Sequence, residues 1–223
     1  MITGTSALEA RSLYRFFRAG DEETLALREV SLSVGPGELI AIAGPSGSGK
    51  STLLACLAGL DEPDGGTVLV DGKRLSHQPE RARARIRANH IGVLFQSGNL
   101  LDHLTVTGNV GLSQSLSGAK AASTPAELLA SVDLSHRANA YPSELSGGEA
   151  ARAALAVAIA NDPVVLLADE PTGELDSRTE EIILDLLLAR ARRGLAVVVA
   201  SHSPGVSRCA DRTVRLADGR LAA

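Results

Sequence analysis

The segment from Gly44 to Ser51 reads Gly-Pro-Ser-Gly-Ser-Gly-Lys-Ser, which matches the Gly-x4-Gly-Lys-Ser/Thr pattern of phosphate-binding loops. Glycines at these positions let backbone N–H groups approach phosphate oxygens, and the helix that follows adds partial positive charge. The ammonium group of Lys50 can reach the outer phosphates, and the Ser51 hydroxyl can bind Mg²⁺. The residues predicted to contact phosphate are Gly44, Pro45, Ser46, Gly47, Ser48, Gly49, Lys50, Ser51 and Thr52.

Two acidic residues, Asp169 and Glu170, follow the apolar run 164–168. That run predicts a buried strand, and a carboxylate at the C-terminal end of such a strand can hold Mg²⁺ through water. We assign this metal-binding role to Asp169. Glu170 follows it, where its carboxylate can orient or deprotonate an attacking water molecule. The alternative is a surface acidic pair that caps a helix, but the nearby phosphate loop favours catalysis.

Two further polar residues come after predicted strands. Gln96 follows the run 91–95, and on its own it predicts nothing. His202 comes just after the run 196–200. An isolated histidine is more often structural, but ligands of parallel sheets bind at the carboxyl ends of the strands. A contact between His202 and the terminal phosphate is therefore favoured.

A second glycine-rich segment, Leu145-Ser-Gly-Gly-Glu149, lies far from the first in the sequence. Ser146 can cap a helix whose free N–H groups face an anion. The second segment, like the first, therefore predicts a helix start that can bind an anion.

Strand-like apolar runs alternate with helical segments along the chain, which predicts an α/β fold with a mostly parallel core sheet. Residues 8–34 are expected to form short strands with a turn at 18–21, and Asp218-Gly219 is expected to close a hairpin. Other strands are predicted at 39–43, 67–70, 91–95, 164–168 and 196–200, and helices at 52–60, 79–89, 125–131, 147–160 and 177–193.

Between about Gly98 and Ala160 the runs of β-branched residues become rare, and alanine, leucine and serine dominate. This change predicts a helical subdomain, approximately residues 98–160, inserted in the α/β domain. No internal repeat or low-complexity linker is evident, so residues 1–223 are expected to form a single domain.

The composition argues against several classes of protein. The 223 residues carry a formal net charge of −4, so no global basic field would attract nucleic acid. The basic run from Arg81 to Arg87 is interpreted as a solvated helix face, with a membrane or nucleic-acid patch as the alternative. Cys56 and Cys209 lack metal-site spacing and are expected to be inert thiols. No signal peptide or membrane span is predicted, so a membrane role would need a partner that supplies the span.

The order of these motifs resembles that of the nucleotide-binding subunits of ATP-binding-cassette (ABC) transporters. The resemblance extends from about Leu8 to Leu221. It implies a P-loop NTPase fold with an N-terminal antiparallel β subdomain and an inserted α-helical subdomain. The matching motifs are Walker A at 44–51, the Q-loop at 95–96, the signature motif at 145–149, Walker B at 166–172, the D-loop at 174–177 and the switch histidine at 201–202.

The resemblance implies an ATPase that uses ATP and Mg²⁺ and forms a homodimer when ATP binds. Two subunits would enclose two ATP molecules head to tail. Ser146, Gly147 and Gly148 of one copy would contact the γ-phosphate held by Lys50 of the other. Asp176 would communicate across this interface. Closure would then bind the partner in one state, and hydrolysis would release it.

The same resemblance implies roles in catalysis, metal binding and coupling. The catalytic residues would be Lys50, Glu170 and His202. The metal ligands would be Ser51, Gln96 and Asp169. Gln96 would also link the helical subdomain to a transmembrane permease. The chain would thus be cytoplasmic and peripheral on the inner face of the cell membrane, with membrane contact only through the permease.

Family members also stack an aromatic side chain on adenine, upstream of Walker A. Tyr14, Phe16 and Phe17 lie in that part of the chain, which has only three Phe and two Tyr residues in total. We assign the stacking to Phe17, although packing in the core explains aromatic residues equally well.

Within the family, the stretches 91–101 and 168–177 are most similar to the branch that serves lipoprotein release, macrolide or antimicrobial-peptide export, and cell division. This implies that the chain powers export or extraction of a substrate. The alternatives are a mechanotransmitting cell-division ATPase without cargo, a soluble remodelling ATPase and an ATP sensor without turnover. The chain departs from the family pattern at three places. Glu149 stands where glutamine is usual, Glu174 stands where asparagine is common in this branch, and an arginine usually found near Val157 is absent.

Overall fold

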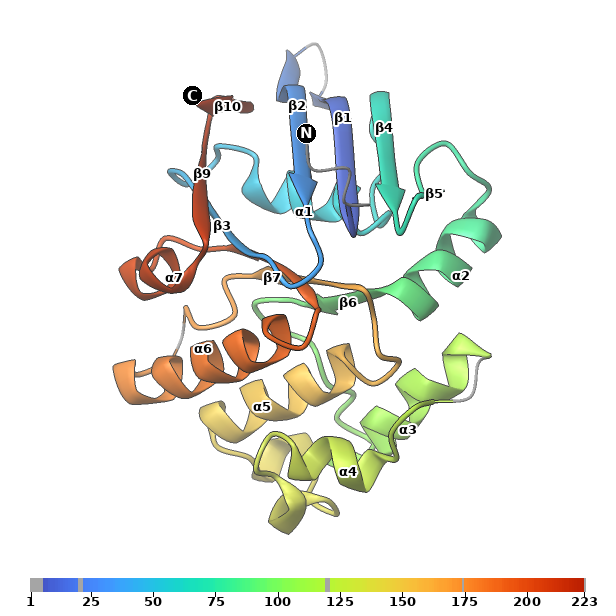
Figure 1. The fold of residues 1–223 in the computed structure, drawn as a ribbon, viewed down its shortest axis with the longest axis vertical. Coiled ribbons are helices and arrows are strands. Elements are labelled where there is room, and N and C mark those ends of the chain that lie inside the picture. The colour runs from blue at the N-terminus through green and yellow to red at the C-terminus, as the bar shows by residue number, and fades with distance from the viewer. Residues whose placement is uncertain (1–5, 20–21, 119–120, 174, 223) are drawn as a thin grey trace.

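The computed structural model describes residues 6–19, 22–118, 121–173 and 175–222. Within these ranges two sheets are stacked with a helix between them (Figure 1). One sheet has four antiparallel strands in the order β2-β1-β4-β5, and the other has six in the order β10-β9-β3-β8-β7-β6. Strands β9, β3, β8, β7 and β6 run parallel, and β10 pairs antiparallel with β9. The predicted α/β class, with its mostly parallel core sheet and N-terminal antiparallel sheet, is confirmed.

The elements have the following bounds. The strands are β1 (Leu8–Ala19), β2 (Glu22–Val34), β3 (Leu39–Ala43), β4 (Gly65–Val70), β5 (Lys73–Arg74), β6 (Ile91–Leu94), β7 (Val165–Asp169), β8 (Ala196–Ala200), β9 (Arg212–Ala217) and β10 (Arg220–Ala222). The helices are α1 (Lys50–Leu57), α2 (Glu80–His90), α3 (Val106–Ser117), α4 (Pro125–Ala130), η1 (Ser135–Arg137), η2 (Pro142–Glu144), α5 (Gly147–Ala158), α6 (Ser177–Ala191) and α7 (Pro204–Cys209).

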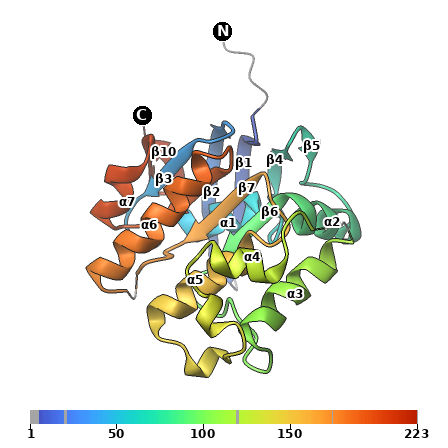
Figure 2. The ribbon, with the colours of Figure 1, turned by 60° about the horizontal axis from the view of Figure 1, so that its bottom comes forward.

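The parallel sheet is buried on both faces, because its strands alternate between two hydrophobic clusters. In β3, Ile40 and Ile42 face α1 and the antiparallel sheet, whereas Leu39 and Ala41 face the helices on the other side. Figure 1 shows α1 between the sheets, and Figure 2 shows α3, α4, α5 and α6 in front of the parallel sheet. This packing fixes the carboxyl ends of β3, β6, β7 and β8 along one edge.

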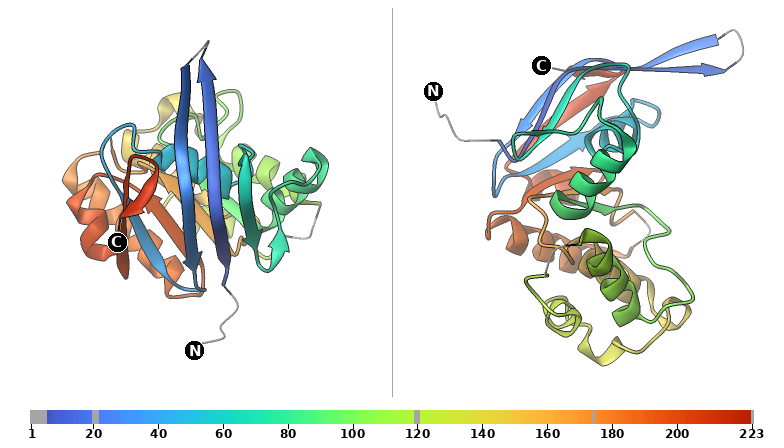
Figure 3. Two further views of the ribbon diagram at one scale, coloured as in Figure 1. Left: turned by 90° about the horizontal axis from the view of Figure 1, so that it is seen from above. Right: turned by 90° about the vertical axis from the view of Figure 1, so that its right-hand side faces the viewer.

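The N-terminal segment is one long hairpin, so the prediction of short strands was wrong. β1 pairs with β2 from Leu8–Val34 to Ala19–Glu22, and the far ends of both strands project beyond the rest of the molecule (Figure 3). The register shifts at several points, and Ser12 adopts a φ of 47°. These irregularities interrupt the alternation of apolar and polar residues that would have indicated a long strand.

Helix α3 was not predicted, because glycine and polar residues interrupt its apolar periodicity. Its cap is local: Thr105 Oγ1 accepts a hydrogen bond from Gly108 N–H at 3.1 Å. Asn109 is buried, and its amide oxygen accepts a hydrogen bond from Leu101 N–H at 2.7 Å. Helix α3 therefore depends on polar contacts to the preceding loop, which a search for hydrophobic periodicity does not detect.

The basic run lies on α2, which has no fully buried residue. Arg81 and Arg85 are exposed, as expected for a solvated face, whereas the side chains of Arg83 and Arg87 are only 16% and 22% exposed. Arg83 pairs with Glu62, and Arg87 pairs with Glu80 at 2.9 Å. Burial, the largest cause, raises the pKa of the free Cys56 thiol to about 12, which keeps it protonated. Among the described residues, every helix is too short or too polar to cross a lipid bilayer.

Candidate active site

The phosphate-binding loop connects β3 to α1 at the carboxyl edge of the parallel sheet. Helix α1 begins after Gly49, which has a φ of 103°, and it has neither a side-chain cap nor an acidic residue in its first turn. The N-terminal N–H groups of α1 are thus left to an external acceptor. Lys50 Nζ donates hydrogen bonds to the carbonyl oxygens of Gly44 at 2.9 Å and Pro45 at 3.1 Å, which hold the ammonium group over the loop.

Two glycines of this loop are required by close packing. A Cβ atom at Gly44 would lie 2.2 Å from the carbonyl oxygen of Leu216, and one at Gly49 would lie 2.6 Å from that of Ala26. The loop is therefore held against β9 and β2. Ser48 differs from its neighbours, since its side chain is buried beneath the loop.

A cavity of about 1000 Å³ opens over this loop. It joins the loop to the ends of β6, β7 and β8 and to the hairpin β1–β2. Most of the residues that the sequence assigned to nucleotide, metal or catalysis line it: Phe17, Gly44, Pro45, Ser46, Gly47, Gly49, Lys50, Ser51, Thr52, Gln96, Asp169, Glu170 and His202.

Glu170 is the most constrained acidic side chain of this cavity. One of its carboxylate oxygens accepts a hydrogen bond from Ser201 Oγ at 2.9 Å, and the other lies 2.9 Å from His202 Nδ1. Its backbone has a φ of 46°, a left-handed value that is uncommon outside glycine. Its side chain is 15% exposed, whereas that of His202 is 75% exposed. A carboxylate held in this way, with the imidazole of His202 beside it, can accept a proton from water.

The residues assigned to metal binding offer only oxygen atoms. Ser51 contributes a hydroxyl, Gln96 an amide and Asp169 a carboxylate, and all three line the same cavity. Among the described residues, no cluster of three or more His, Cys, Asp or Glu side chains could hold a metal ion alone. The set fits Mg²⁺, which uses few protein ligands and completes its shell with water and phosphate oxygens.

Of the three N-terminal aromatic residues, the structure places Phe17 on the cavity wall. The residue is 42% exposed, and the guanidinium carbon of Arg15 lies 4.7 Å from the ring centroid. Tyr14 instead lies beside Gly65, where a Cβ atom would be 3.6 Å from its ring. Phe17 thus has a position from which it can stack on a base, and one contact that fixes its ring.

The cavity also contains residues that the sequence reasoning missed, namely those from Thr24 to Ala26, Arg28, Asp218 and Gly219. The C-terminal turn is tied to the phosphate-binding loop, since Gly219 N–H donates to the carbonyl oxygen of Ser48 at 3.1 Å. Asp-Gly predicted a turn at this point, but nothing in the sequence indicated that the turn would reach the loop.

The second glycine motif lies outside this cavity. Ser146 and Gly147 are exposed at the start of α5, and Gly148 lies so close to α6 that a Cβ atom would be 2.7 Å from Thr179 Cγ2. Asp176 caps α6 and accepts hydrogen bonds from Arg178 N–H and Thr179 N–H, both at 3.0 Å. These bonds, Thr179 first, lower the pKa of Asp176.

Glu174, the second departure from the family pattern, lies outside the described residues. The first departure, Glu149, is in the first turn of α5 and takes part in its cap.

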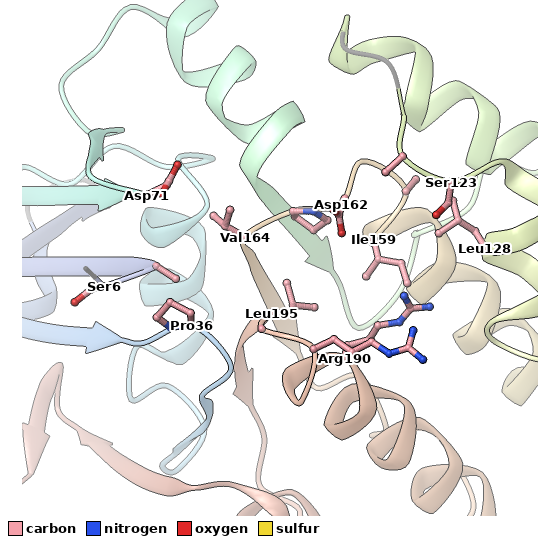
Figure 4. A pocket seen from close by; sticks show the side chains of 16 residues that line it. Ser6, Pro36, Asp71, Ser123, Leu128, Ile159, Asp162, Val164, Arg190 and Leu195 are labelled. Atoms are coloured by element: carbon pink, nitrogen blue, oxygen red, sulfur yellow. The ribbon is translucent and has the colours of Figure 1, made fainter. Parts of the chain in front are cut away.

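A second cavity, of about 570 Å³, lies between the antiparallel sheet and the helices (Figure 4). Its wall includes Val164 and Leu195, which directly precede β7 and β8, and Pro36, which lies in the turn before β3. Arg190 and Asp162 also face it. It is thus at the opposite edge of the sheet from Lys50, and the carboxyl edge is where parallel sheets bind ligands.

Comparison with known proteins identifies the family. The family model for ABC transporters matches residues 27–173. The lipoprotein-releasing system ATP-binding protein LolD 2 of Caulobacter vibrioides is 41% identical over 218 residues, which cover 96% of each chain. An uncharacterised ABC transporter ATP-binding protein of Mycobacterium tuberculosis is 42% identical over 209 residues, or 92% of this chain and 84% of that protein.

Solved structures agree with this result. The dimeric bacterial ABC transporter cassette MJ0796 has a TM-score of 0.89 and 37% identity, with 97% of both chains covered. The same cassette, solved as a dimer in a post-hydrolysis state with ADP and phosphate, is 36% identical, with a TM-score of 0.89. These findings confirm the predicted resemblance and the ATPase activity. The chain belongs to the ABC transporter family and is one of its ATP-hydrolysing subunits.

Proposed function

We propose that this chain closes as a homodimer around ATP and uses ATP hydrolysis to power export or extraction of a substrate through a separate membrane permease. The observation that carries the proposal is the single cavity that joins an uncapped helix N-terminus to a firmly held carboxylate. The similarity to a lipoprotein-releasing ATP-binding protein supports the export branch.

In this proposal the phosphates of ATP rest on the N-terminus of α1. Lys50 exchanges its two loop carbonyls for phosphate oxygens, and adenine stacks on Phe17. Ser51, Gln96 and Asp169 would hold Mg²⁺, which supplies charge neutralisation at the phosphates when it is bound.

Glu170 orients the attacking water molecule and accepts its proton. Ser201 and His202 hold the two carboxylate oxygens in place, so the base is positioned before the substrate arrives. His202 Nδ1 faces Glu170, which leaves Nε2 to contact the γ-phosphate. The P–O bond between the γ-phosphate and ADP breaks as the water oxygen adds to phosphorus.

The second copy of the chain completes the site. Ser146, Gly147 and Gly148 lie outside the cavity of their own chain, and Ser146 and Gly147 are exposed. We assign them to the γ-phosphate bound by the other copy. Asp176, beside them at the start of α6, would transmit closure from one copy to the other.

A permease segment would bind in an apolar groove of about 520 Å³ between α2, β6 and α3. Three large apolar side chains that line it are exposed: Leu60 by 47%, Phe95 by 45% and Leu116 by 69%. Such a patch on a surface indicates an interaction site. Phe95 directly precedes Gln96, so a segment in this groove would sense the nucleotide cavity. The chain would then be cytoplasmic and peripheral on the inner face of the membrane.

The substitution Glu170→Gln tests the proposed function. We expect it to lower ATP turnover by about a hundredfold or more, since the general base is lost, and to trap an ATP-bound dimer. Size measurements with and without ATP would show a dimer only with ATP. Glu62→Gln serves as the control, since Glu62 also has hydrogen bonds to both carboxylate oxygens but lies outside the cavity. A Glu170→Gln chain that is monomeric in both conditions would contradict the proposal.

Contact with the permease has a separate test. Leu116→Asp should release the subunit from its membrane partner in co-purification, because a carboxylate in an apolar groove loses its hydration. ATP-dependent dimerisation of the isolated subunit should not change. Retention of the partner by this variant would contradict the assignment of the groove.

A further inference from the structure

Glu149, the last residue of the signature motif, places a carboxylate in the first turn of α5. The proposed function directs the start of this helix toward the γ-phosphate of the other copy's ATP. A carboxylate would repel a phosphate nearby, since like charges at short range oppose each other. The surroundings of Glu149 therefore decide whether the motif can bind an anion.

Both carboxylate oxygens of Glu149 have partners. Oε2 accepts hydrogen bonds from the backbone N–H of Ser146 at 2.8 Å and from its Oγ–H at 2.9 Å. Oε1 accepts a hydrogen bond from Nε of Arg137 at 2.7 Å, and His136 Nε2 lies 3.5 Å away. The Glu149 side chain is only 12% exposed. One oxygen thus belongs to the helix cap, and the other is bound by a cation.

Arg137 ends the short helix η1, ahead of the motif in the sequence, and its own side chain is 41% exposed. We propose that Arg137 is a positioning residue of the ATP-dependent dimer: its guanidinium group neutralises Glu149 and keeps the start of α5 attractive to the γ-phosphate held by the second copy. This inference rests on the proposed function.

The contribution of Arg137 is one of charge, because the helix cap is complete without it. Ser146 supplies two hydrogen bonds to Oε2, and Glu149 N–H donates in return to Ser146 Oγ at 3.3 Å. Hydrogen bonds from Ser146, followed by that from Arg137, lower the pKa of Glu149 to about 2. Without Arg137 the carboxylate would keep its Ser146 contacts and remain ionised at neutral pH, with no guanidinium group to offset its negative charge beside the incoming phosphate.

The experiment compares variants in the Glu170→Gln background, where hydrolysis does not disperse the dimer. The dimer dissociation constant of each variant is measured by sedimentation over a range of protein concentrations, at saturating ATP. The variants are Arg137→Ala, Glu149→Gln and the double variant. We expect Arg137→Ala to raise that constant by about tenfold, because each of two interfaces gains a repulsive charge at a helix N-terminus. Glu149→Gln should not weaken the dimer, and it should restore the dimer of the Arg137→Ala variant.

Two controls separate charge from folding. Arg212 forms a comparable pair with Glu38, with Nε and Oε1 at 2.6 Å and the arginine 43% exposed, but neither residue lines the nucleotide cavity. Arg212→Ala should therefore leave the dimer unchanged. The defect of Arg137→Ala should also shrink as the salt concentration rises, since screening weakens the repulsion.

The outcomes distinguish this inference from the proposed function. A double variant that dimerises as weakly as Arg137→Ala would show a structural role for the arginine and overturn the inference. Equal dimerisation with and without Arg137 would overturn it alone. A Glu170→Gln chain that stays monomeric with ATP would overturn the ATP sandwich and this inference together.

Discussion

Two helices of this ATPase begin with glycine-rich segments, and their N-termini are built in opposite ways. Helix α1 follows Gly49, has no side-chain cap and carries no acidic residue in its first turn. Helix α5 follows Ser146, whose hydroxyl and the carboxylate of Glu149 form a reciprocal capping box. Both helix N-termini can attract an anion, but that of α1 has no side-chain cap, whereas that of α5 is capped by Ser146 and Glu149.

The difference follows from what each helix meets within one copy of the chain. The start of α1 is held by its own β2 and β9 and faces a cavity of the same chain. Ser146 and Gly147, at the start of α5, are exposed on the surface. A side-chain cap stabilises such an end in water, and it still leaves backbone N–H groups in the first turn for a ligand. We infer that α1 is prepared for ATP and α5 for a second subunit.

The largest expected effect is at α1, the helix without a side-chain cap. Lys50→Ala should weaken ATP binding by about a hundredfold or more, because a charge-assisted contact to the phosphates is lost. Nucleotide titration of the monomer measures this. Lys73→Ala, which removes an exposed lysine outside the cavity, is the control. Unchanged ATP affinity of Lys50→Ala would contradict the assignment of the loop.

Gly47 and Gly49, in the loop before α1, differ in the physical reason for which glycine is needed. At Gly47, φ is 77° and a Cβ atom would meet nothing within 4 Å, whereas at Gly49, φ is 103° and a Cβ atom would meet a backbone oxygen at 2.6 Å. We expect Gly47→Ala to lower the free energy of unfolding by about 1 kcal/mol from backbone strain alone. Gly49→Ala should cost about 3 kcal/mol, since the strand behind it must move as well. Equal losses in chemical denaturation would show that the close contact is easily relieved.

The sequence predicted the parts of the site that depend on local spacing. Local spacing predicts the loop from Gly44 to Ser51 and the polar residues that follow strands β7 and β8, and the parallel sheet brings them to one edge. Gln96, which follows β6, and Phe17 were assigned from the family resemblance. Their roles in binding and catalysis remain predictions that the experiments above address.

The parts that were missed depend on contacts between distant segments or on polar packing. The turn at Asp218 and Gly219 reaches the phosphate-binding loop only because β9 pairs with β3. Helix α3 is fixed by the buried amide of Asn109, which hydrophobic periodicity does not reveal. The pairing of Arg137 with Glu149 connects helix η1 to the signature motif, and no pattern in the sequence predicts it.

Helix α5, whose N-terminus is capped, provides the next test of the comparison. Ser146→Ala should lower the free energy of unfolding by about 1 kcal/mol, because the cap of α5 is lost. It should also weaken the ATP-dependent dimer, whereas ATP binding by the monomer should not change. Thr124→Ala is the matched control, since Thr124 and Glu127 form the same capping box on α4. If both variants lost stability and neither affected the dimer, α5 would carry no special role at the interface.

The smallest expected effect concerns acid. The pKa of Glu149 is lowered from 4.5 to about 2 in the folded chain, by Ser146 first and Arg137 second. Its ionised form therefore stabilises the fold fully above pH 4.5, and this contribution is lost as the pH falls from 4.5 toward 2. Glu149→Gln lacks the charge at every pH. The difference in melting temperature between the parent chain and this variant should accordingly shrink across that interval.

A matched measurement on α4 isolates the contribution of the arginine to this acid dependence. Glu127 has its pKa lowered by hydrogen bonds from Thr124 alone, with no guanidinium group among the causes. Glu127→Gln should thus show the same trend with a smaller amplitude. Melting curves between pH 6 and pH 2.5 decide the matter. A difference that stays constant for Glu149→Gln over this range would mean that the capped N-terminus of α5 draws no stability from the charge, and that the contrast with α1 is one of hydrogen bonding only.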